Sequence, residues 1–404
     1  MIDYLHEANV IKEELIQIRR DLHEHPELDF DLNRTCSKVT SFLKNEKINY
    51  KIVAKTGVCA LIKGNNKDRR NYNKTIALRA DLDALPIQDK KKCSYKSKEK
   101  GKMHACGHDA HCAILLGAAK IINKYKERFS GNVKLFFEPA EETTGGSKLM
   151  IKENVLEDPY VDTVVGLHVE ETLKTGQISL RKGIGNASSN PFKIIIKGKG
   201  GHGASPQNTI DPIVIASQII NALQIVISRE ISPVTKAVIS IGSIHSGTAS
   251  NIIPDNVVIT GIIRTLSEED RKFILDRFKT IIDKITQSLR GEAILRIEEG
   301  YPCLYNNSKV VDMVSNSAKE LIGEENVIQK ENPSLGVESF AYFAGIRPST
   351  FYYLGTRNDQ KKTNYPAHGS LFDIDEDAIV IGAALQSKIA IDYLTSDNFN
   401  INLI

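Results

Sequence analysis

Cysteine and histidine residues gather in the segment HACGHDAH, which spans residues 104–111. Cys106 and His108 stand two positions apart around Gly107, directly before an apolar stretch with helical periodicity. A loop at the N-terminus of a helix can direct both side chains to one point, and the helix dipole there favours the thiolate form of cysteine. Thiolate and imidazole are ligands that zinc prefers. A Cys-x-His pair also arises by chance, so this pair alone leaves a purely structural role open.

Acidic residues and a further histidine follow three other apolar runs. Asp81 and Asp83 end TIALRADLD, Glu141 and Glu142 end NVKLFFEPAEE, and His168 follows DTVVGL. Adjacent side chains on an extended backbone point to opposite sides, so one glutamate is expected to bind metal while its neighbour faces the substrate as general base. Taken singly, these features also fit a helix cap, a solvated acidic turn or a packed histidine.

The four groups share one position in the expected fold. Each lies at or just beyond the C-terminal end of an apolar strand, and this edge of an open α/β sheet is where ligands bind. Together they offer thiolate, imidazole and carboxylate ligands with one carboxylate left over. That combination is what metal-assisted hydrolysis requires.

The elements that must position these residues follow from hydrophobic periodicity. In the first part of the chain, short apolar runs alternate with helical segments such as HCAILLGAAKIINKYKERF, which predicts an α/β domain. Its sheet should be mostly parallel, with helices on both faces. Near residue 186 the order becomes β-α-β-β-α-β, the ferredoxin-like α+β arrangement. We therefore predict a main domain of residues 1–185 and 301–404 that carries an insert of residues 186–300.

Composition narrows the function classes. The formal net charge is only +3, with 53 basic against 50 acidic residues, so the chain lacks the basic excess of a nucleic-acid partner. The charged N-terminal segment lacks the apolar core of a signal peptide, and no run approaches the roughly 18 apolar residues of a membrane span. The six cysteines are scattered, as in intracellular proteins. We expect a cytoplasmic protein without nucleic-acid or membrane partners.

With these residues in view, the sequence resembles the metallo-amidohydrolase family of bacterial aminoacylases, hippurate hydrolases and plant auxin–amino-acid conjugate hydrolases. That family belongs to the larger aminoacylase/carboxypeptidase metallopeptidase group. The resemblance runs nearly end to end and in the same order, through RRDLHEHPEL, ALRADLDALPI, MHACGHDAH, FFEPAEE, GLHV, GKGGHGASP, GTASNIIPD, GIIRT and AHGSLFDIDEDAI.

The resemblance implies two divalent metal ions per subunit, either zinc, manganese or cobalt. The implied ligands are Cys106, His108, Glu142, His168 and His368. Glu141 would be the general base, and Asp83 would orient the metal site from behind the ligands.

Three further residues are implied in the insert, which would serve as a lid and dimerisation domain. His202 in GGHGA would reach the active site of the neighbouring subunit and stabilise the oxyanion, which implies a homodimer. Asn251 and Arg264 would hold the carboxylate of the substrate.

The expected activity is hydrolysis of the amide bond of small N-acyl amino acids, with a metal-bridged water activated by Glu141. N-acetyl-diaminopimelate deacetylation and small-peptide exopeptidase activity stay open, because the motifs do not include the residues that select the acyl group. A non-catalytic ligand-binding homologue would lack the base or a ligand, and all are present. A structural zinc protein is rejected, since paired Cys-x-x-Cys spacings are absent.

The sequence departs from the family pattern at three places. Glu138 stands where glutamine is more common, Thr143 and Thr144 replace a glycine run, and Ser339 stands where aspartate is usual. The lysine-rich segment 89–102 also differs, and we expect it to form a solvated loop. None of these differences removes an implied ligand, so they concern specificity rather than catalysis.

Overall fold

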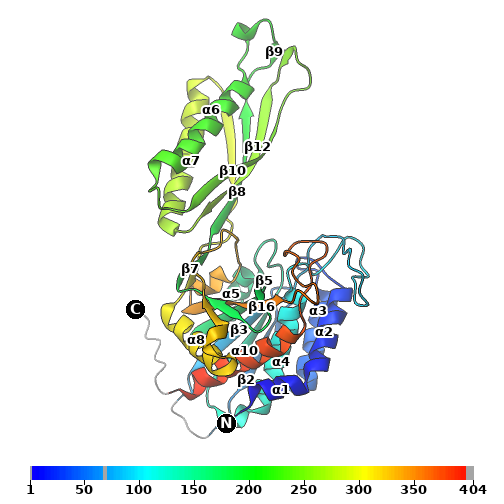
Figure 1. The fold of residues 1–404 in the computed structure, drawn as a ribbon. Coiled ribbons are helices and arrows are strands. Elements are labelled where there is room, and N and C mark those ends of the chain that lie inside the picture. Colours follow the sequence, from blue (N-terminus) through cyan, green and yellow to red (C-terminus); the bar gives the residue numbers. More distant parts are fainter. Residues whose placement is uncertain (1, 67–70, 397–404) are drawn as a thin grey trace. The chain divides into compact units, whose positions relative to one another are not determined.

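The computed structural model describes residues 2–66 and 71–396, and the chain divides into two compact units (Figure 1). Unit 1 comprises Met1–Gly183, Tyr305–Asn332 and Ser339–Ile404. Unit 2 comprises Ile184–Leu304 together with Pro333–Glu338. The chain therefore enters unit 2 from unit 1 twice, once for the large insert and once for the short segment that ends at Glu338.

Unit 1 is built on an eight-stranded sheet with the order β1-β2-β4-β3-β5-β16-β6-β15. The central pairs β4–β3, β3–β5 and β5–β16 are parallel, whereas β1–β2, β2–β4 and β16–β6 are antiparallel. The strands are β1 (Asn49–Val53), β2 (Gly57–Lys63), β3 (Thr75–Asp81), β4 (Asn132–Glu138), β5 (Thr163–Lys174), β6 (Ile178–Leu180), β15 (Val327–Gln329) and β16 (Ser349–Arg357). The prediction of a mostly parallel central sheet is confirmed.

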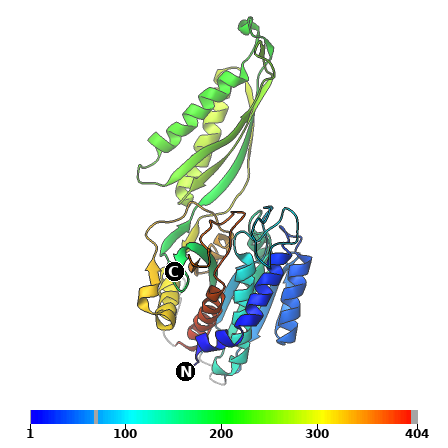
Figure 2. The ribbon, with the colours of Figure 1, turned by 45° about the vertical axis from the view of Figure 1, so that its right-hand side comes forward.

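Helices cover both faces of this sheet. One face carries a large core with α4 packed between α2 and α10 (Figure 2). The helices that contribute to this core are α1 (Tyr4–Val10), α2 (Lys12–Glu24), α3 (Asn33–Asn45), α4 (His108–Lys124), α8 (Ser308–Ile322) and α10 (Asp377–Thr395). On the other face lie α5 (Gly146–Lys152) and α9 (Ala341–Ala344), where Phe343 stacks on Phe136 of β4.

The alternation of side chains along β4 explains the two cores. Val133, Leu135 and Phe137 enter the core beneath α4, whereas Phe136 points to the opposite face. Successive side chains of a strand leave on opposite faces, so a strand buried on both sides reads as a continuous apolar run. This is why NVKLFF was recognisable as a central strand.

Unit 2 has four antiparallel strands in the order β10-β12-β8-β13, with α6 and α7 packed against the sheet. Its elements are β8 (Ser188–Lys197), α6 (Pro212–Ile225), β10 (Ala237–His245), β12 (Asn256–Thr265), α7 (Glu268–Ser288) and β13 (Glu292–Ile297). Ile194, Ile219, Ile259 and Phe278 share its core. The chain order β-α-β-β-α-β confirms the predicted ferredoxin-like arrangement.

Smaller elements complete the chain. In unit 2, β9 (Gly201–His202) pairs with β11 (Ile252–Ile253) beyond the end of the main sheet (Figure 1). A further two-stranded sheet joins β7 (Gly183–Asn186) and β14 (Leu304–Asn306). Short helical turns cover Lys126–Arg128, Pro206–Asn208, Val226–Glu230 and Glu324–Asn326.

Two helices have the length and hydropathy of a membrane span, although the sequence indicated no such run. They are Asp377–Thr395, whose most apolar window is 83% buried within the protein, and Pro212–Glu230, whose window is 33% buried. The first is α10, which the core of unit 1 surrounds. The second contains α6, which has no charged side chain, and part of it faces outward.

Candidate metal centre and active site

The turn after β4 holds the two glutamates. β4 ends at Glu138, and Ala140 has a left-handed backbone with φ of 56°. The expectation that Glu141 and Glu142 continue an extended strand is therefore wrong. Asp83, which follows β3, accepts the backbone N–H of Glu141 at 2.9 Å and that of Glu142 at 3.0 Å. Both carboxylate oxygens of Asp83 are used in this way, so Asp83 fixes the turn from which the two glutamates leave.

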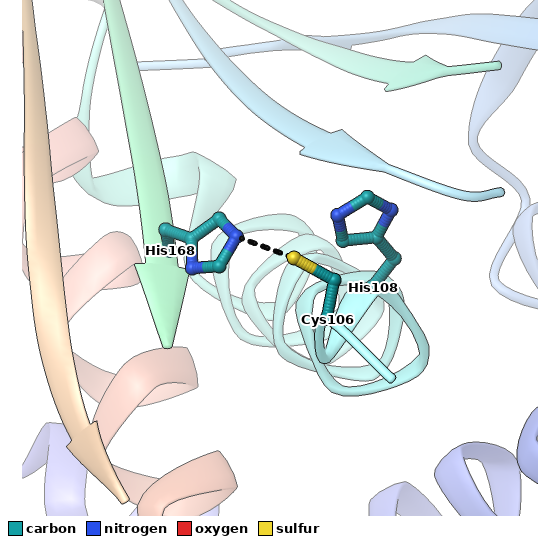
Figure 3. A group of neighbouring side chains, drawn as sticks. All are labelled: Cys106, His108 and His168. Atoms are coloured by element: carbon teal, nitrogen blue, oxygen red, sulfur yellow. Dashed lines mark hydrogen bonds between the residues drawn. The ribbon is translucent and has the colours of Figure 1, made fainter. Parts of the chain in front are cut away.

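Cys106 and His108 flank Gly107, which has φ of 89° and precedes the first turn of α4. The sulfur of Cys106 lies 3.3 Å from Nε2 of His168 (Figure 3). Nδ1 of His108 lies 2.8 Å from the backbone carbonyl of Asp83, which can only accept, so Nδ1 carries a proton. The other ring nitrogen of His108 is thereby directed to the centre of the cluster.

His168 lies inside β5 rather than at its end, because β5 continues to Lys174. The neighbouring strand β3 pairs with β5 only as far as Arg79 opposite Gly166, so His168 emerges beyond the end of β3. Its Nδ1 bonds the carbonyl of Val169 at 2.6 Å, which turns Nε2 toward Cys106. Burial lowers the pKa of His168 to about 3, so the imidazole is neutral, as a metal ligand must be.

His368 reaches the same place from a loop before α10. Its backbone is left-handed, with φ of 63°, and its N–H donates to the carbonyl of Ala105 at 2.7 Å. The N–H of Ala367 donates to Oε1 of Glu171 at 3.0 Å. Nε2 of His368 lies 3.3 Å from Oε1 of Glu142. The His368 loop is thus bonded both to the segment that bears Cys106 and to the end of β5.

The donor atoms of these residues form overlapping groups in which all ligand atoms lie within 4.8 Å of one another. The groups are Cys106 with His108 and His168, Cys106 with Glu142 and His368, His108 with Glu141 and Glu142, and Asp81 with His108 and His111. The structure therefore brings together all five residues implied as ligands.

A divalent cation fits this cluster. Nε2 of His108 and Oε1 of Glu142 are both buried, and neither has a hydrogen-bond partner in the described part of the chain. Buried polar atoms without partners are costly, and a metal ion would satisfy both. Burial raises the pKa of the Cys106 thiol, whereas Asp81 and Cys106 outweigh burial and raise the pKa of His108. A cation would displace both of these protons.

Glu141 has a different environment from Glu142. It is only 7% exposed, and its Oε1 accepts the backbone N–H of Ser339 at 3.1 Å. Glu142 instead faces His368 and His108. Oε1 of Glu141 thus accepts from a backbone N–H, whereas Oε1 of Glu142 faces two implied ligands, a difference that suits one carboxylate to be a ligand and the other a general base.

His111 lies in the first turn of α4, and its ring bridges the residues at which β3 ends and β5 passes His168. Its Nδ1 is 2.6 Å from Oδ1 of Asp81, and its Nε2 accepts the backbone N–H of Val169 at 2.9 Å. Because Nε2 accepts, the proton is on Nδ1, and both ring nitrogens are engaged. Burial lowers the pKa of His111 even though Asp81 opposes the shift, so the neutral tautomer persists. Because both of its ring nitrogens form hydrogen bonds, His111 is a candidate support for the implied ligands rather than one of them.

A buried charge network anchors the start of α4. Asp109, next to His108, accepts from Arg19 at 2.8 Å and contacts Nδ1 of His23 at 2.7 Å. Nζ of Lys91 lies 2.8 Å from the other ring nitrogen of His23. The expectation that segment 89–102 is wholly solvated is therefore wrong, because Asp89 and Lys91 are buried. Buried charges persist when they are paired and hydrogen-bonded, as these are.

The three residues implied in the insert all lie in unit 2. Nδ1 of His202 accepts the N–H of Ala204 at 3.0 Å, so a neutral His202 carries its proton on Nε2. Asn251 is beside it, since its carbonyl accepts the N–H of Gly203 at 2.8 Å. Arg264 lies elsewhere: it pairs with Ser189 at the start of β8, whereas His202 follows the end of β8. The structure thus groups Asn251 with His202 and not with Arg264.

Comparison with known proteins identifies the family of the chain. Residues 77–392 match the family model "Peptidase family M20/M25/M40". The chain is 40% identical to thermostable carboxypeptidase 2 of Saccharolobus solfataricus over 95% of this chain and 96% of that protein. It is 37% identical to an N-acetylcysteine deacetylase of Bacillus subtilis, over 93% and 96%. It is also 37% identical to the hippurate hydrolase of Campylobacter jejuni, over 94% and 97%.

Solved structures show the same fold. A putative aminohydrolase from methicillin-resistant Staphylococcus aureus superposes with a TM-score of 0.90 at 35% identity, covering 97% of this chain and 99% of that one. A dinuclear metal-binding peptidase of Bacillus subtilis superposes with a TM-score of 0.81 at 33% identity, covering 96% and 99%. The resemblance drawn from the motifs is confirmed. The chain belongs to peptidase family M20/M25/M40 and is a hydrolase of that family.

Proposed function

We propose that this protein hydrolyses the amide bond of N-acyl amino acids with two divalent metal ions. The ions, either zinc, manganese or cobalt, would be held by Cys106, His108, Glu142, His168 and His368. The observation that supports this most directly is the pair of buried ligand atoms that form no hydrogen bond in the described part of the chain, Nε2 of His108 and Oε1 of Glu142, beside a Glu141 that is held by Ser339. Two relatives that cover nearly the whole chain are named for N-acyl amino acid hydrolysis.

Three residues of unit 1 have distinct tasks in this reaction: Glu141, Asp83 and His111. When bound, the metal ions would polarise the scissile carbonyl and acidify the attacking water. Glu141 removes the proton from that water and later gives it to the departing amine. Asp83 keeps the turn of Glu141 and Glu142 in place, because both N–H groups bond to it. His111 holds β5 at Val169, next to His168.

Residues of unit 2 complete the site in this proposal. His202 stabilises the developing oxyanion, for which its proton on Nε2 makes it a donor. Arg264 binds the carboxylate of the amino acid, and Asn251, which lies beside His202, assists from the copy of unit 2 that supplies His202. The backbone carbonyl of Leu335 accepts from Nη1 of Arg264 at 2.7 Å and so fixes the direction of the guanidinium.

The register of β8 favours a homodimer in which unit 2 is a lid and dimerisation domain. Arg264 pairs with Ser189, whereas Asn256 pairs with Lys197 near the end that leads to His202. Eight residues separate Ser189 from Lys197, which is roughly 26 Å at ~3.3 Å per residue. An oxyanion and a carboxylate of one small substrate lie only a few ångströms apart, so a single unit 2 does not supply both His202 and Arg264. In a homodimer, one of the two residues comes from the neighbouring subunit.

The outward face of α6 is suited to contact between two copies. Ile213, Val214 and Ile225 are 44%, 51% and 50% exposed, and α6 contains no charged residue. Exposed apolar surface without charge is typical of subunit interfaces. This face therefore supports dimerisation through unit 2.

Cleavage of small peptides is a second candidate function, since two relatives at 39% and 40% identity are named thermostable carboxypeptidases. N-acetyl-diaminopimelate deacetylation is a third, because the same site chemistry applies to it. We place the enzyme in the cytoplasm, with a small-molecule substrate and without nucleic-acid or membrane partners.

A substrate panel tests the proposal. Metal-reconstituted protein is incubated with N-acetyl, N-benzoyl and indole-acetyl amino acids, N-acetyl-diaminopimelate and dipeptides, and amine release is measured. Glu141→Gln should keep its metal and lose at least about a hundredfold in kcat. Glu13→Gln, an exposed change on α2, is the matched control and should behave as wild type. Two bound metals with no cleavage of any panel member would overturn the proposal.

A further inference from the structure

A set of fully buried polar groups lies directly behind the proposed general base. The backbone N–H of Ser339 donates to Oε1 of Glu141 at 3.1 Å. The hydroxyl of the same residue donates to Oε1 of Glu138 at 2.6 Å. Ser339 and Glu138 are both 0% exposed. Ser339 therefore connects Glu141, at the active site, with a buried carboxylate that takes no part in metal binding.

Arg79 holds this connection from the other side. Its guanidinium donates to Oε2 of Glu138 at 2.7 Å, to Oδ2 of Asp81 at 2.7 Å and to the hydroxyl of Ser339 at 3.0 Å. The hydroxyl of Ser339 thus accepts from Arg79 while it donates to Glu138. Its proton is committed to a carboxylate, which leaves Ser339 unsuited to be a nucleophile.

The backbone of Ser339 is fixed as well. The hydroxyl of Ser147, at the start of α5, donates to the carbonyl of Ser339 at 2.9 Å. The N–H of Ser147 donates to Glu138 at 2.6 Å. Ser339 is therefore held through both its side chain and its carbonyl, so its N–H has one direction in space. That direction points at Glu141.

We propose that Ser339 is a positioning residue for Glu141, with the buried Arg79–Glu138 ion pair as its support. This inference rests on the proposed function, in which Glu141 is the general base. A base that is free to rotate loses catalytic power, because a misplacement of about 1 Å can lower a rate roughly a hundredfold. Because Oε1 of Glu141 accepts from an N–H whose own position is fixed, the orientation of the carboxylate is restrained. The support also stays out of contact with substrate, so it acts on the reaction only through Glu141.

The network also shows which changes are compensating. Ser339 and Glu138 together present one carboxylate to Arg79, and Nη2 of Arg79 already contacts position 339. The pair Glu138→Gln and Ser339→Asp moves this carboxylate across a 2.6 Å contact and conserves the buried charge. Ser339→Asp alone places two buried carboxylates in contact, and Glu138→Gln alone leaves Arg79 with one carboxylate fewer. Both leave an imbalance of buried charge, which is strongly unfavourable.

Kinetics test the positioning role. Ser339→Ala keeps the backbone N–H but removes the hydroxyl that ties it to Glu138 and Arg79. The variant should therefore lower kcat by about tenfold, with KM within about twofold and with unchanged metal content. In a Glu141→Asp background the shorter side chain does not reach the N–H, so Ser339→Ala should cause no further loss. The matched control is Ser317→Ala, which removes another buried hydroxyl that donates to a carboxylate, Asp392 at 2.7 Å, and should leave kcat unchanged. An equal loss in the wild-type and Glu141→Asp backgrounds would overturn the inference.

Melting temperatures test the supporting role of the Arg79–Glu138 ion pair independently of enzyme activity. Glu138→Gln and Ser339→Asp should each lower the melting temperature, and the double variant should recover at least half of the summed loss and most of kcat. Strictly additive losses would show that positions 138 and 339 act independently, and would overturn the supporting role of the Arg79–Glu138 ion pair. If wild type cleaves the panel and Ser339→Ala does so equally well, only this inference fails. If wild type cleaves nothing, the proposed function fails, and the positioning role with it.

Discussion

The backbone N–H of Val169, the residue after His168, donates to Nε2 of His111 at 2.9 Å. His111 donates in turn from Nδ1 to Asp81 at the end of β3. The ring therefore spans two neighbouring strands, β3 and β5, that lead to the candidate metal centre. Groups of this kind orient ligands without binding the metal themselves.

His111→Ala should weaken metal binding without removing a ligand. It leaves the carboxylate of Asp81 and the N–H of Val169 short of a partner, at a cost of about 1–3 kcal/mol for each buried group. Metal affinity should fall about 10- to 100-fold, while two equivalents still bind at saturation. Titration with metal-buffered solutions measures both quantities. His108→Ala is the comparison, and a stoichiometry lowered equally by both variants would identify His111 as a ligand instead.

Glu171 should hold the loop of His368 through its contact with Ala367. A left-handed backbone such as that of His368 costs about 1 kcal/mol or more and persists only where neighbouring bonds enforce it. Glu171→Ala should therefore lower the affinity for the more weakly held metal by about tenfold, whereas Glu171→Gln keeps an acceptor and should not.

Graded chelation followed by metal analysis measures this effect of Glu171. Glu170→Ala is the control, because Glu170 bonds Thr172 and lies 3.7 Å from Lys330 instead of the His368 loop. Equal loss from Glu171→Ala and Glu171→Gln would show that the charge, rather than the hydrogen bond, matters.

Acid should destabilise the network that anchors α4 through Asp373. Burial alone would raise the pKa of Asp373, but Arg19 and Lys91 outweigh it and lower the pKa from 3.8 to about 2. A depressed folded-state pKa contributes stability above the unfolded pKa of about 4, and this stability is lost as the pH falls toward 2. The contribution is about 2 kcal/mol at neutral pH.

Urea unfolding of wild type and Asp373→Asn measures this contribution. The variant should be less stable by about 2 kcal/mol at pH 7, and the difference should narrow between pH 4 and pH 2. A difference that is constant over this range would show that Asp373 acts through packing rather than charge.

Mixing two inactive variants tests whether His202 acts on the partner subunit. Glu141→Gln lacks the base and His202→Ala lacks the oxyanion donor, so each homodimer should be inactive. After random exchange, half of the dimers are mixed, and each mixed dimer has one complete site. Activity should return to about a quarter of the wild-type value. No recovery, with subunit exchange demonstrated by mass spectrometry, would show that His202 acts within its own subunit or not at all.

The parts of the fold that the sequence predicted are those with local signals. Periodicity located β3, β4 and α4, and the acids that follow the strands marked the edge at which the site forms. His368 carries no such signal, because its place depends on a left-handed backbone and on bonds to Ala105 and Glu171, far away in sequence. Only the family resemblance pointed to it.

Long-range contacts account for the misjudged residues. Lys91 reads as one of many solvated lysines, yet a buried ring nitrogen of His23 lies 2.8 Å from its amine. Glu138 and Ser339 appeared as unrelated departures from the family pattern, yet they share a hydrogen bond across 201 positions of sequence. Such pairings become visible only when the strands and loops are placed in space.

The division of the chain gives Ser339 a further significance. Ser339 is the first residue of unit 1 after the segment Pro333–Glu338, which belongs to unit 2. The N–H that donates to Glu141 is therefore part of one of the four peptide bonds at which the chain passes between the units. The segment Pro333–Glu338 is thus connected to the proposed general base along the covalent chain, without a side-chain relay. One covalent link between the units is therefore also a direct link to the residue that we propose transfers the proton.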